Sequence, residues 1–315
     1  MPTSLIPQEI YLLERYSSAE YFDEMRQAWI SMLNVAETAL QQYMLNLPPD
    51  YRNRHLSQQP DIVWGERVLP NFRSTRESQD GAYIQLLGGE LAALGAAYGV
   101  SSDARGQTMD YPANWMSDAD EAKFYEFQGI ATKRASNIAF TEDSGWYSTD
   151  LTSNYHPESR GPLNAPYTWP TYRLNNDIKI KTEEEVKQSG IYLPECNDSC
   201  ASLMVKGAEA WEAEVGYDPK TTHALRRENT TWTLVERIAD SGGSIPGREA
   251  ASATLEATRI RVEGGQTCPQ AGWYFTPVQS NSRRLFKKDD VMPSLAGDYG
   301  VTIWQWDADQ SAPNG

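Results

Sequence analysis

The sequence predicts an α+β protein, with an N-terminal antiparallel helical bundle followed by a mixed region that ends in a small antiparallel, aromatic-rich β-sheet. As far as Glu142, apolar side chains recur at helical spacing. Beyond residue 140 this spacing fades, seven of the ten tryptophans occur, and the chain closes with a run of β-branched and aromatic residues. We therefore expect a bundle over residues 1–142 and a mixed region over 143–315.

The first predicted helix runs from about Ala19 to Leu47. Ser17 and Ser18 provide N-cap side chains, and the apolar residues that follow recur at steps of three or four along one face. Pro48 and Pro49 end the helix, because proline cannot continue the hydrogen-bond ladder. We expect this face to form core, with a groove for a partner as the alternative.

Two further helices are predicted before residue 142. One runs from about Phe72 to Ala97 and contains Gly88-Gly89, each costing about 1 kcal/mol relative to alanine. No nucleotide-binding pattern surrounds these glycines. The other helix runs from Asp118 to Ala139. Ser117 caps it, and Asp118, Asp120 and Glu121 lie near its positive end.

Residues 144–175 predict a long loop, because glycine, proline, serine and asparagine are frequent there. A loop of this length in a compact protein is usually functional or mobile. Its aromatic residues suit a protein interface, as tryptophan and tyrosine often anchor such contacts. The alternative is that the rings pin the loop onto the bundle. The loop carries Trp146, Tyr147, Tyr155 and Trp169.

The segment after this loop predicts a mixture of short strands and helices, with no internal repeat recognised. Thr182 and Glu185 match a capping box, so we expect a short helix that ends at Gly190. A further helix is expected from Ser202 to Val215. Strands are expected at Asp177–Ile180, Thr230–Ile238 and Leu255–Val262.

Residues 267–307 predict a small antiparallel unit of three or four short strands. In the last strand, alternation places Thr302, Trp304 and Trp306 on one side. Arg283 and Arg284 are adjacent and should face opposite sides. We expect the inward arginine to pair with a carboxylate such as Asp298 or Asp307.

The composition is acidic, with 28 basic and 43 acidic side chains and a formal net charge of −15. This argues against a nucleic-acid partner, which usually requires a basic face. It fits a protein that attracts a basic partner, although acidity alone is also common in cytosolic proteins. The chain shows no secretory signal and no apolar run of about 18 residues, so we expect a cytoplasmic protein without a membrane partner.

No motif in the chain indicates catalysis or metal binding. Cys196 and Cys200 form one pair, whereas a zinc site typically needs two, and Cys268 lies far away in the sequence. We expect unpaired thiols, no metal, no cofactor and no catalytic residue, hence a protein that is not an enzyme. One alternative is a hydrolase that uses a histidine beside a carboxylate, with His156 or His223 as the acid–base residue. Another is a scaffold whose helical half binds a partner helix.

The C-terminal unit resembles a known family. The order of its residues is similar to the C-terminal signature of bacterial immunity proteins from polymorphic toxin loci, including those of type VI secretion and Rhs-type effectors. Immunity families seventy-one and seventy-two are the nearest resemblance, which is dense over about the last fifty residues. The match rests on Cys268-Pro269, Gly272-Trp273, Thr276-Pro277, Ser282-Arg283-Arg284, Phe286, Met292-Pro293, Tyr299-Gly300 and Thr302-Ile303-Trp304-Gln305-Trp306.

The resemblance implies a protein that binds one cognate toxin domain, encoded by a neighbouring gene, and covers its active site. An acidic surface suits toxins that act on anionic substrates, since their clefts tend to be basic. From residue type and loop position, we expect toxin contacts from Trp146, Tyr147, Tyr155, Trp169, Asp118, Asp120 and Glu121. The signature residues are expected to be architectural: Gly272, Trp273, Arg283, Arg284, Phe286, Pro293, Tyr299, Gly300, Trp304 and Trp306.

Overall fold

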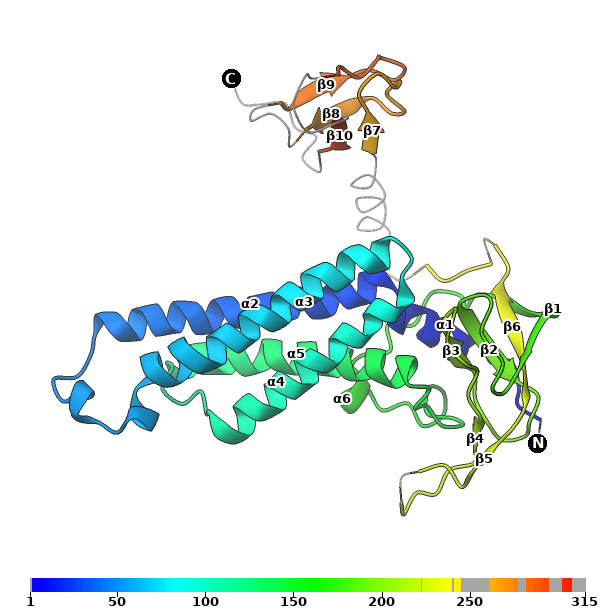
Figure 1. Ribbon diagram of the computed structural model, residues 1–315, viewed down its shortest axis with the longest axis horizontal. Coiled ribbons are helices and arrows are strands. Elements are labelled where there is room, and N and C mark those ends of the chain that lie inside the picture. Colours follow the sequence, from blue (N-terminus) through cyan, green and yellow to red (C-terminus); the bar gives the residue numbers. More distant parts are fainter. Residues whose placement is uncertain are drawn as a thin grey trace. The chain divides into compact units, whose positions relative to one another are not determined.

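The computed structural model describes residues 2–221, 223–239, 241–244, 261–276, 282–294 and 302–307 (Figure 1). The predicted α+β class is confirmed. The chain divides into two compact units. The first comprises Met1–Leu163 and Trp169–Gly243, and the second Asn164–Thr168 and Ser244–Gly315. The expected domain boundary at residues 142–143 coincides with the end of a helix at Glu142, whereas the compact units separate at residue 243.

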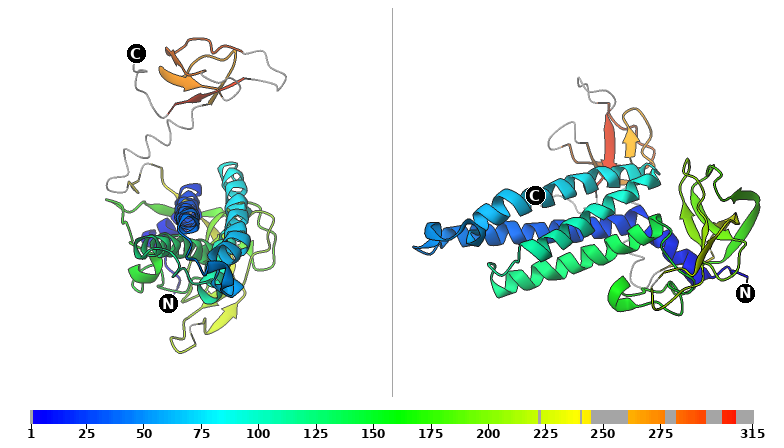
Figure 2. Two further views of the ribbon diagram at one scale, coloured as in Figure 1. Left: turned by 90° about the vertical axis from the view of Figure 1, so that its left-hand side faces the viewer. Right: turned by 60° about the horizontal axis from the view of Figure 1, so that its bottom comes forward.

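The first unit begins with a helical bundle. Helix α2 packs against α3 and α5, and α4 packs against α5 and α3, so these four helices close on one another (Figures 1 and 2). The helices are α1 (Pro7–Tyr16), α2 (Ala19–Leu45), α3 (Leu69–Leu87), α4 (Ala97–Asp110), α5 (Asp118–Glu142) and α6 (Pro157–Arg160). Shorter turns are η1 (Tyr51–Asn53), η2 (Leu56–Gln58), the π-helical η3 (Asp61–Val68) and η4 (Leu91–Ala96).

Two of the predicted helices are confirmed, and the third is wrong at its C-terminal end. Helices α2 and α5 begin where expected, because the Ser18 and Ser117 hydroxyls accept hydrogen bonds from the first helical turns. The helix predicted through Ala97 instead ends at Leu87. Gly89 follows with a φ of +90°, a conformation that glycine adopts without strain and that terminates the helix.

Aromatic residues fill the bundle core, as the apolar face of α2 predicted. The Trp29 indole donates a hydrogen bond to the Phe72 carbonyl (3.0 Å), and the two rings meet edge to face. Phe72 is also close to Trp64 and Phe124, and all four side chains are almost fully buried. This packing joins α2, η3, α3 and α5.

A four-stranded antiparallel sheet completes the first unit, with the strand order β1-β6-β2-β3 and a separate hairpin of β4 and β5. The short helices predicted at residues 182–190 and 202–215 are wrong, because these segments form turns and strands. The strands are β1 (Tyr172–Lys181), β2 (Gly190–Pro194), β3 (Ser202–Met204), β4 (Ala213–Val215), β5 (Arg226–Glu228) and β6 (Thr231–Arg237).

The second unit contains another four-stranded antiparallel sheet, which confirms the strands predicted near the C-terminus. Its strands are β7 (Arg261–Glu263), β8 (Gly272–Phe275), β9 (Arg284–Phe286) and β10 (Ile303–Trp306), in the order β7-β10-β8-β9. Trp304 and Trp306 point into one core, as alternation predicted. Some residues named in the sequence analysis lie outside the described residues. They are Asp298, Tyr299 and Gly300, and residues 255–260 of the strand expected at Leu255–Val262.

The two sheets are copies of one fold, so the expectation of no internal repeat is wrong. Corresponding strands have the same order and direction. In the first sheet Gly190 pairs with Met204, and in the second Gly272 pairs with Phe286. The separation in sequence between the two glycines equals that between their two partners, so the register of pairing is the same in both copies. The last strands of the two copies, β6 and β10, are separated by fewer residues than the other equivalent strands. The reason is that the chain between β3 and β6 contains the β4–β5 hairpin and is longer than the chain between β9 and β10.

The same side chains make the same hydrogen bonds in both copies. The Tyr192 hydroxyl donates to the carbonyl of Gln188 (2.8 Å), and the Tyr274 hydroxyl donates to that of Gln270 (2.9 Å). In each core one buried tryptophan indole donates to a carbonyl of the segment that covers the sheet. These bonds are Trp232 to Trp211 (3.0 Å) and Trp304 to Pro293 (2.8 Å).

Candidate functional site

A cleft of about 840 Å³ is lined by the end of α2, the α2–α3 connector and the α4–α5 loop. Figure 1 shows that the end of α2 lies at the opposite end of the bundle from the first sheet. The volume of the cleft falls in the range of about 300–1,000 Å³ that is typical of binding pockets. We call it the end cleft. It is lined by Tyr43, Arg54, His55, Leu56, Ser57, Gln58, Pro60, Ile62, Val63, Trp64, Arg67, Asp110, Tyr111, Pro112, Asn114 and Trp115.

Aromatic rings in mutual contact form one wall of the end cleft. Trp115 meets Trp64 and Tyr43 edge to face, with ring centroids 5.3 and 5.9 Å apart. The Trp115 indole N–H is shielded from solvent and has no acceptor among the described residues. A buried donor without an acceptor is unfavourable. The Trp115 indole N–H is therefore a buried donor in this wall that no described residue accepts.

The connector between α2 and α3 contributes most of the lining residues, and ionic contacts fix its path. The Tyr51 hydroxyl donates to Asp61 (2.5 Å), and Arg52 forms an ion pair with the same carboxylate (2.7 Å). Burial, together with this bond to Asp61, raises the pKa of Tyr51 to about 12. Arg54 is held by Asp50 (3.2 Å). Among the described residues Arg67 makes no ion pair, so one lining cation is open to a partner carboxylate.

An acidic turn follows the end cleft directly in the chain. Four residues from Tyr111 onwards line the cleft, namely Tyr111, Pro112, Asn114 and Trp115, and α5 begins at Asp118. Asp118 is exposed, whereas Asp120 and Glu121 are half-buried. The Ser117 hydroxyl donates to the Asp120 carboxylate (2.7 Å), so Asp120 also takes part in the helix cap. The structure thus places these three predicted contact residues together, beside the end cleft.

The predicted aromatic contacts from the long loop are packed onto the first unit. Trp146 is 2% exposed, stacks on Tyr16, and donates its indole N–H to Thr141 (3.0 Å). The Tyr155 hydroxyl bonds the Gly161 carbonyl (3.0 Å). Two further rings are half-buried: Tyr147 lies against Tyr217, and Trp169 meets Tyr11 edge to face. The loop is therefore pinned, and Trp146 has no surface to offer a partner.

The three histidines lie in separate parts of the first unit. The His55 side chain caps η2, because its Nδ1 accepts from the Ser57 backbone N–H (3.3 Å). The same nitrogen lies 2.8 Å from the Ser57 hydroxyl oxygen. His156 precedes α6, and His223 lies beside the β4–β5 hairpin. Only His55 lies in the end cleft, where it shares the lining with Asp110.

The three cysteines are free thiols. The Cys200 thiol donates to the Trp146 carbonyl (2.9 Å), and burial raises its pKa. The Cys268 thiol donates to the Gln270 carbonyl (3.0 Å). In the described ranges no three histidine, cysteine or acidic side chains converge as metal ligands.

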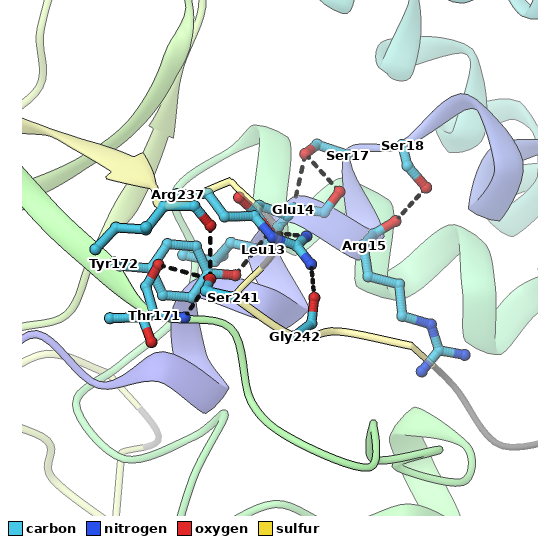
Figure 3. Close-up of polar contacts among 11 residues, drawn as sticks. Leu13, Glu14, Arg15, Ser17, Ser18, Thr171, Tyr172, Arg237, Ser241 and Gly242 are labelled. Carbon is cyan, nitrogen blue, oxygen red and sulfur yellow. Dashed lines mark hydrogen bonds and ion pairs between the residues drawn. The ribbon is translucent and has the colours of Figure 1, made fainter.

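Helix α1 joins the bundle to the first sheet through two glutamates. The Glu14 carboxylate accepts from the Tyr172 hydroxyl (2.7 Å) and pairs with Arg237 (3.3 Å) (Figure 3). Glu9 accepts from the backbone N–H of Ala201 (2.9 Å). Burial raises the pKa of Glu9 to about 7, against the smaller opposing effect of this hydrogen bond. Sequence analysis missed both glutamates, because their partners lie in distant parts of the sequence.

In the second unit, the predicted ion pair is confirmed but its orientation is wrong. Arg283 pairs with Asp307 (2.5 Å), and its guanidinium lies over the Trp273 ring, 4.4 Å from the centroid. Neither Trp273 nor Arg283 belongs to the core, so this pair lies on the opposite face of the sheet. Arg284 is exposed and reaches the Trp304 ring at 6.0 Å. Among the other signature residues, Gly272 pairs with Phe286 across β8 and β9, Phe286 lies in the core, and the Pro293 carbonyl accepts the Trp304 indole N–H.

No described helix has both the length and the apolar character needed to cross a membrane. Comparisons of the chain with models of known protein families, with curated protein sequences and with solved structures found no match. The likeness to immunity proteins therefore stays a prediction from the C-terminal residues.

Proposed function

We propose that this chain neutralises a cognate toxin domain by stoichiometric binding that covers the toxin's active site. The observation that carries the proposal is the end cleft, an aromatic-walled cavity beside an acidic helix start. Buried aromatic anchors and charged rims are typical of protein interfaces. The C-terminal resemblance to immunity proteins supports the same function.

In this mechanism a loop of the toxin inserts into the end cleft. An apolar toxin side chain packs against Trp115 and the rings in contact with it. Asp118 and Glu121 attract the basic rim of a toxin active site, because opposite charges speed diffusional encounter. Protection requires binding alone, with no chemical turnover.

The first experiment expresses the protein encoded beside this chain's gene in a susceptible cell, with and without this chain. The proposal predicts survival only when this chain is present, and a one-to-one complex of the two purified proteins. Leu56→Asp places a charge in the end cleft and should weaken binding at least tenfold. Ile84→Asp is the matched control, since Ile84 is similarly exposed on α3 outside the cleft lining. Equal binding by both variants would remove the end cleft from the mechanism.

A second experiment tests the acidic turn. The double variant Asp118→Lys with Glu121→Lys should slow association about tenfold at low salt and reduce its salt dependence. Asp120 is left intact because its carboxylate accepts from the Ser117 hydroxyl of the cap. Glu77→Lys with Glu90→Lys changes the net charge equally at exposed positions elsewhere in the bundle. If both double variants associate at the wild-type rate, the turn does not steer the partner.

A hydrolase is the second candidate, because the end cleft contains both His55 and Asp110. Against it, the His55 Nδ1 already accepts the Ser57 hydrogen bonds that cap η2. His156 and His223 lie outside the end cleft and are replaced by alanine, whereas His55 is replaced by asparagine, which keeps an acceptor for the Ser57 N–H; this triple variant should leave rescue from the toxin unchanged. Loss of rescue by a variant that remains folded would favour the hydrolase.

A further inference from the structure

The charged side chains that line the end cleft come from two different segments of the bundle. Of the described lining residues, three carry a full charge at neutral pH. Arg54 and Arg67 belong to the α2–α3 connector, and Arg67 lies in the last turn of η3. Asp110 is the last residue of α4. The connector therefore supplies the cations of the lining, and the end of α4 supplies the anion.

Two of these three charges are not neutralised within the described part of the chain. The Arg54 Nε and Nη2 atoms donate to the two carboxylate oxygens of Asp50, each at 3.2 Å. Arg67 and Asp110 form no ion pair and no side-chain hydrogen bond there, either with each other or with another residue. Both are exposed. The lining thus presents one cation and one anion, at separate points, that a partner can reach.

The rest of the site offers apolar contact. Tyr43 and Trp115 are half-buried rings in the lining, and Leu56 is 60% exposed. Exposed apolar side chains continue next to the lining, since Leu45 ends α2 with 82% of its surface exposed and Met109, in the last turn of α4, is 76% exposed. Contiguous exposed apolar surface with a polar rim is typical of an interaction site.

This combination selects the chemistry of the segment that enters the cleft. A purely apolar segment would remove Arg67 and Asp110 from water without giving either a partner, which is unfavourable. A nucleic acid or another polyanion would be repelled by Asp110 and by the net charge of −15. A peptide segment with an acidic, an apolar and a basic side chain matches all three features. Because its two charges have opposite signs, such a segment fits in one direction only.

We propose that the end cleft binds a segment of the partner protein in a single orientation that Arg67 and Asp110 set. An acidic side chain of the segment pairs with Arg67, a basic one pairs with Asp110, and an apolar one packs on the aromatic rings. This inference rests on the proposed function, because the segment belongs to the toxin. Asp118 and Glu121 act during approach, whereas Arg67 and Asp110 act once the segment is in the cleft.

The test measures association and dissociation rates of the full chain with the purified product of the neighbouring gene. Arg67→Gln and Asp110→Asn should each speed dissociation by about fivefold or more, because each leaves a partner charge unpaired in the closed cleft. Association should change less than twofold. The matched controls are Lys133→Gln and Glu126→Gln, which make the same changes of charge at exposed positions of α5 outside the lining. Both control variants should dissociate at the wild-type rate.

A charge-reversal experiment identifies the pairing directly. Arg67→Glu should weaken binding more than Arg67→Gln, because it places two carboxylates against each other. The acidic residues of the toxin domain are then changed to lysine one at a time. One of these changes should restore binding to Arg67→Glu and fail to restore it to Asp110→Asn. If no change restores binding, Arg67 has no acidic partner and the orientation is overturned.

The outcomes separate this proposal from the proposed function. If the wild-type chain does not bind the neighbouring gene product, both fail. If the wild type binds, and Arg67→Gln or Asp110→Asn dissociates at the rate of its control, the single orientation is overturned while toxin binding stands. Equally fast dissociation of the controls would assign the effect to net charge, which also overturns the proposal.

Discussion

The two sheets share their core and differ on the sheet face that points away from this core, which we call the outer face. In the cores, Tyr192 and Tyr274 make the same hydrogen bond, as do Trp232 and Trp304. On the outer face, Leu203 is buried whereas its counterpart Leu285 is exposed. The comparison teaches that the core residues specify this small fold, while the outer face is adapted to whatever covers it. In the first copy that is α1.

The largest expected effect tests whether the two cores are independent. Trp232→Ala and Trp304→Ala should each destabilise their own copy by about 3–5 kcal/mol, the cost of removing a fully buried tryptophan. Hydrogen exchange followed by mass spectrometry on the full chain can separate the copies. Trp304→Ala should increase exchange in β8–β10 and leave β2 and β6 unchanged. Increased exchange in both sheets would show that the copies unfold together.

A smaller effect contrasts the equivalent leucines. Leu203→Ala should cost about 2–4 kcal/mol, because it leaves a cavity beneath α1 and α5. Leu285→Ala should change stability by less than about 0.5 kcal/mol, as expected for an exposed residue. Chemical denaturation of each variant, read out by hydrogen exchange of its own sheet, measures both. Equal losses would mean that the second outer face is covered in the free protein.

The junction between α1 and the first sheet should depend on pH through Glu9. Its pKa is raised from 4.5 to about 7 by burial, so the folded protein binds a proton that the unfolded chain releases. The resulting stability is fully present below pH 4.5 and is lost as the pH rises through 7. The difference in unfolding free energy between wild type and Glu9→Gln should therefore shift by about 2 kcal/mol between pH 5 and pH 7. A constant difference over this range would exclude the raised pKa.

A weaker effect is expected from Arg283, which occupies the position of Ala201 in the repeat. Arg283→Ala should cost the second unit about 1 kcal/mol, because a partly exposed ion pair and a cation–π contact are each weak. Protection of the β8–β10 amides provides the measurement. A loss as large as that from Trp304→Ala would place Arg283 among the core residues instead.

The sequence predicted the long helices well, because their signals are local. The apolar face of α2 and the caps at Ser18 and Ser117 lie within the segments they define. The predicted helices at 182–190 and 202–215 failed for the opposite reason. Thr182 and Glu185 match a capping box, but the Lys181 backbone N–H is taken by Glu184 and the following residues pair with distant strands.

The repeat left a faint trace in the sequence. Gln-x-Gly-x-Tyr occurs at 188–192 and 270–274, and Thr-x-Trp at 230–232 and 302–304. The spacing between these motifs is longer in the first copy, because of the β4–β5 insertion, so a fixed-period search misses them. The site was harder to predict. The end cleft joins the α2–α3 connector to the α4–α5 loop, and only tertiary packing brings these two segments together.

The most direct test of this account is hydrogen exchange of the full chain with and without the purified product of the neighbouring gene. The account predicts new protection in the segments that line the end cleft. Strand β2, already covered by α1, should not change. An absence of new protection in the segments that line the end cleft would contradict it.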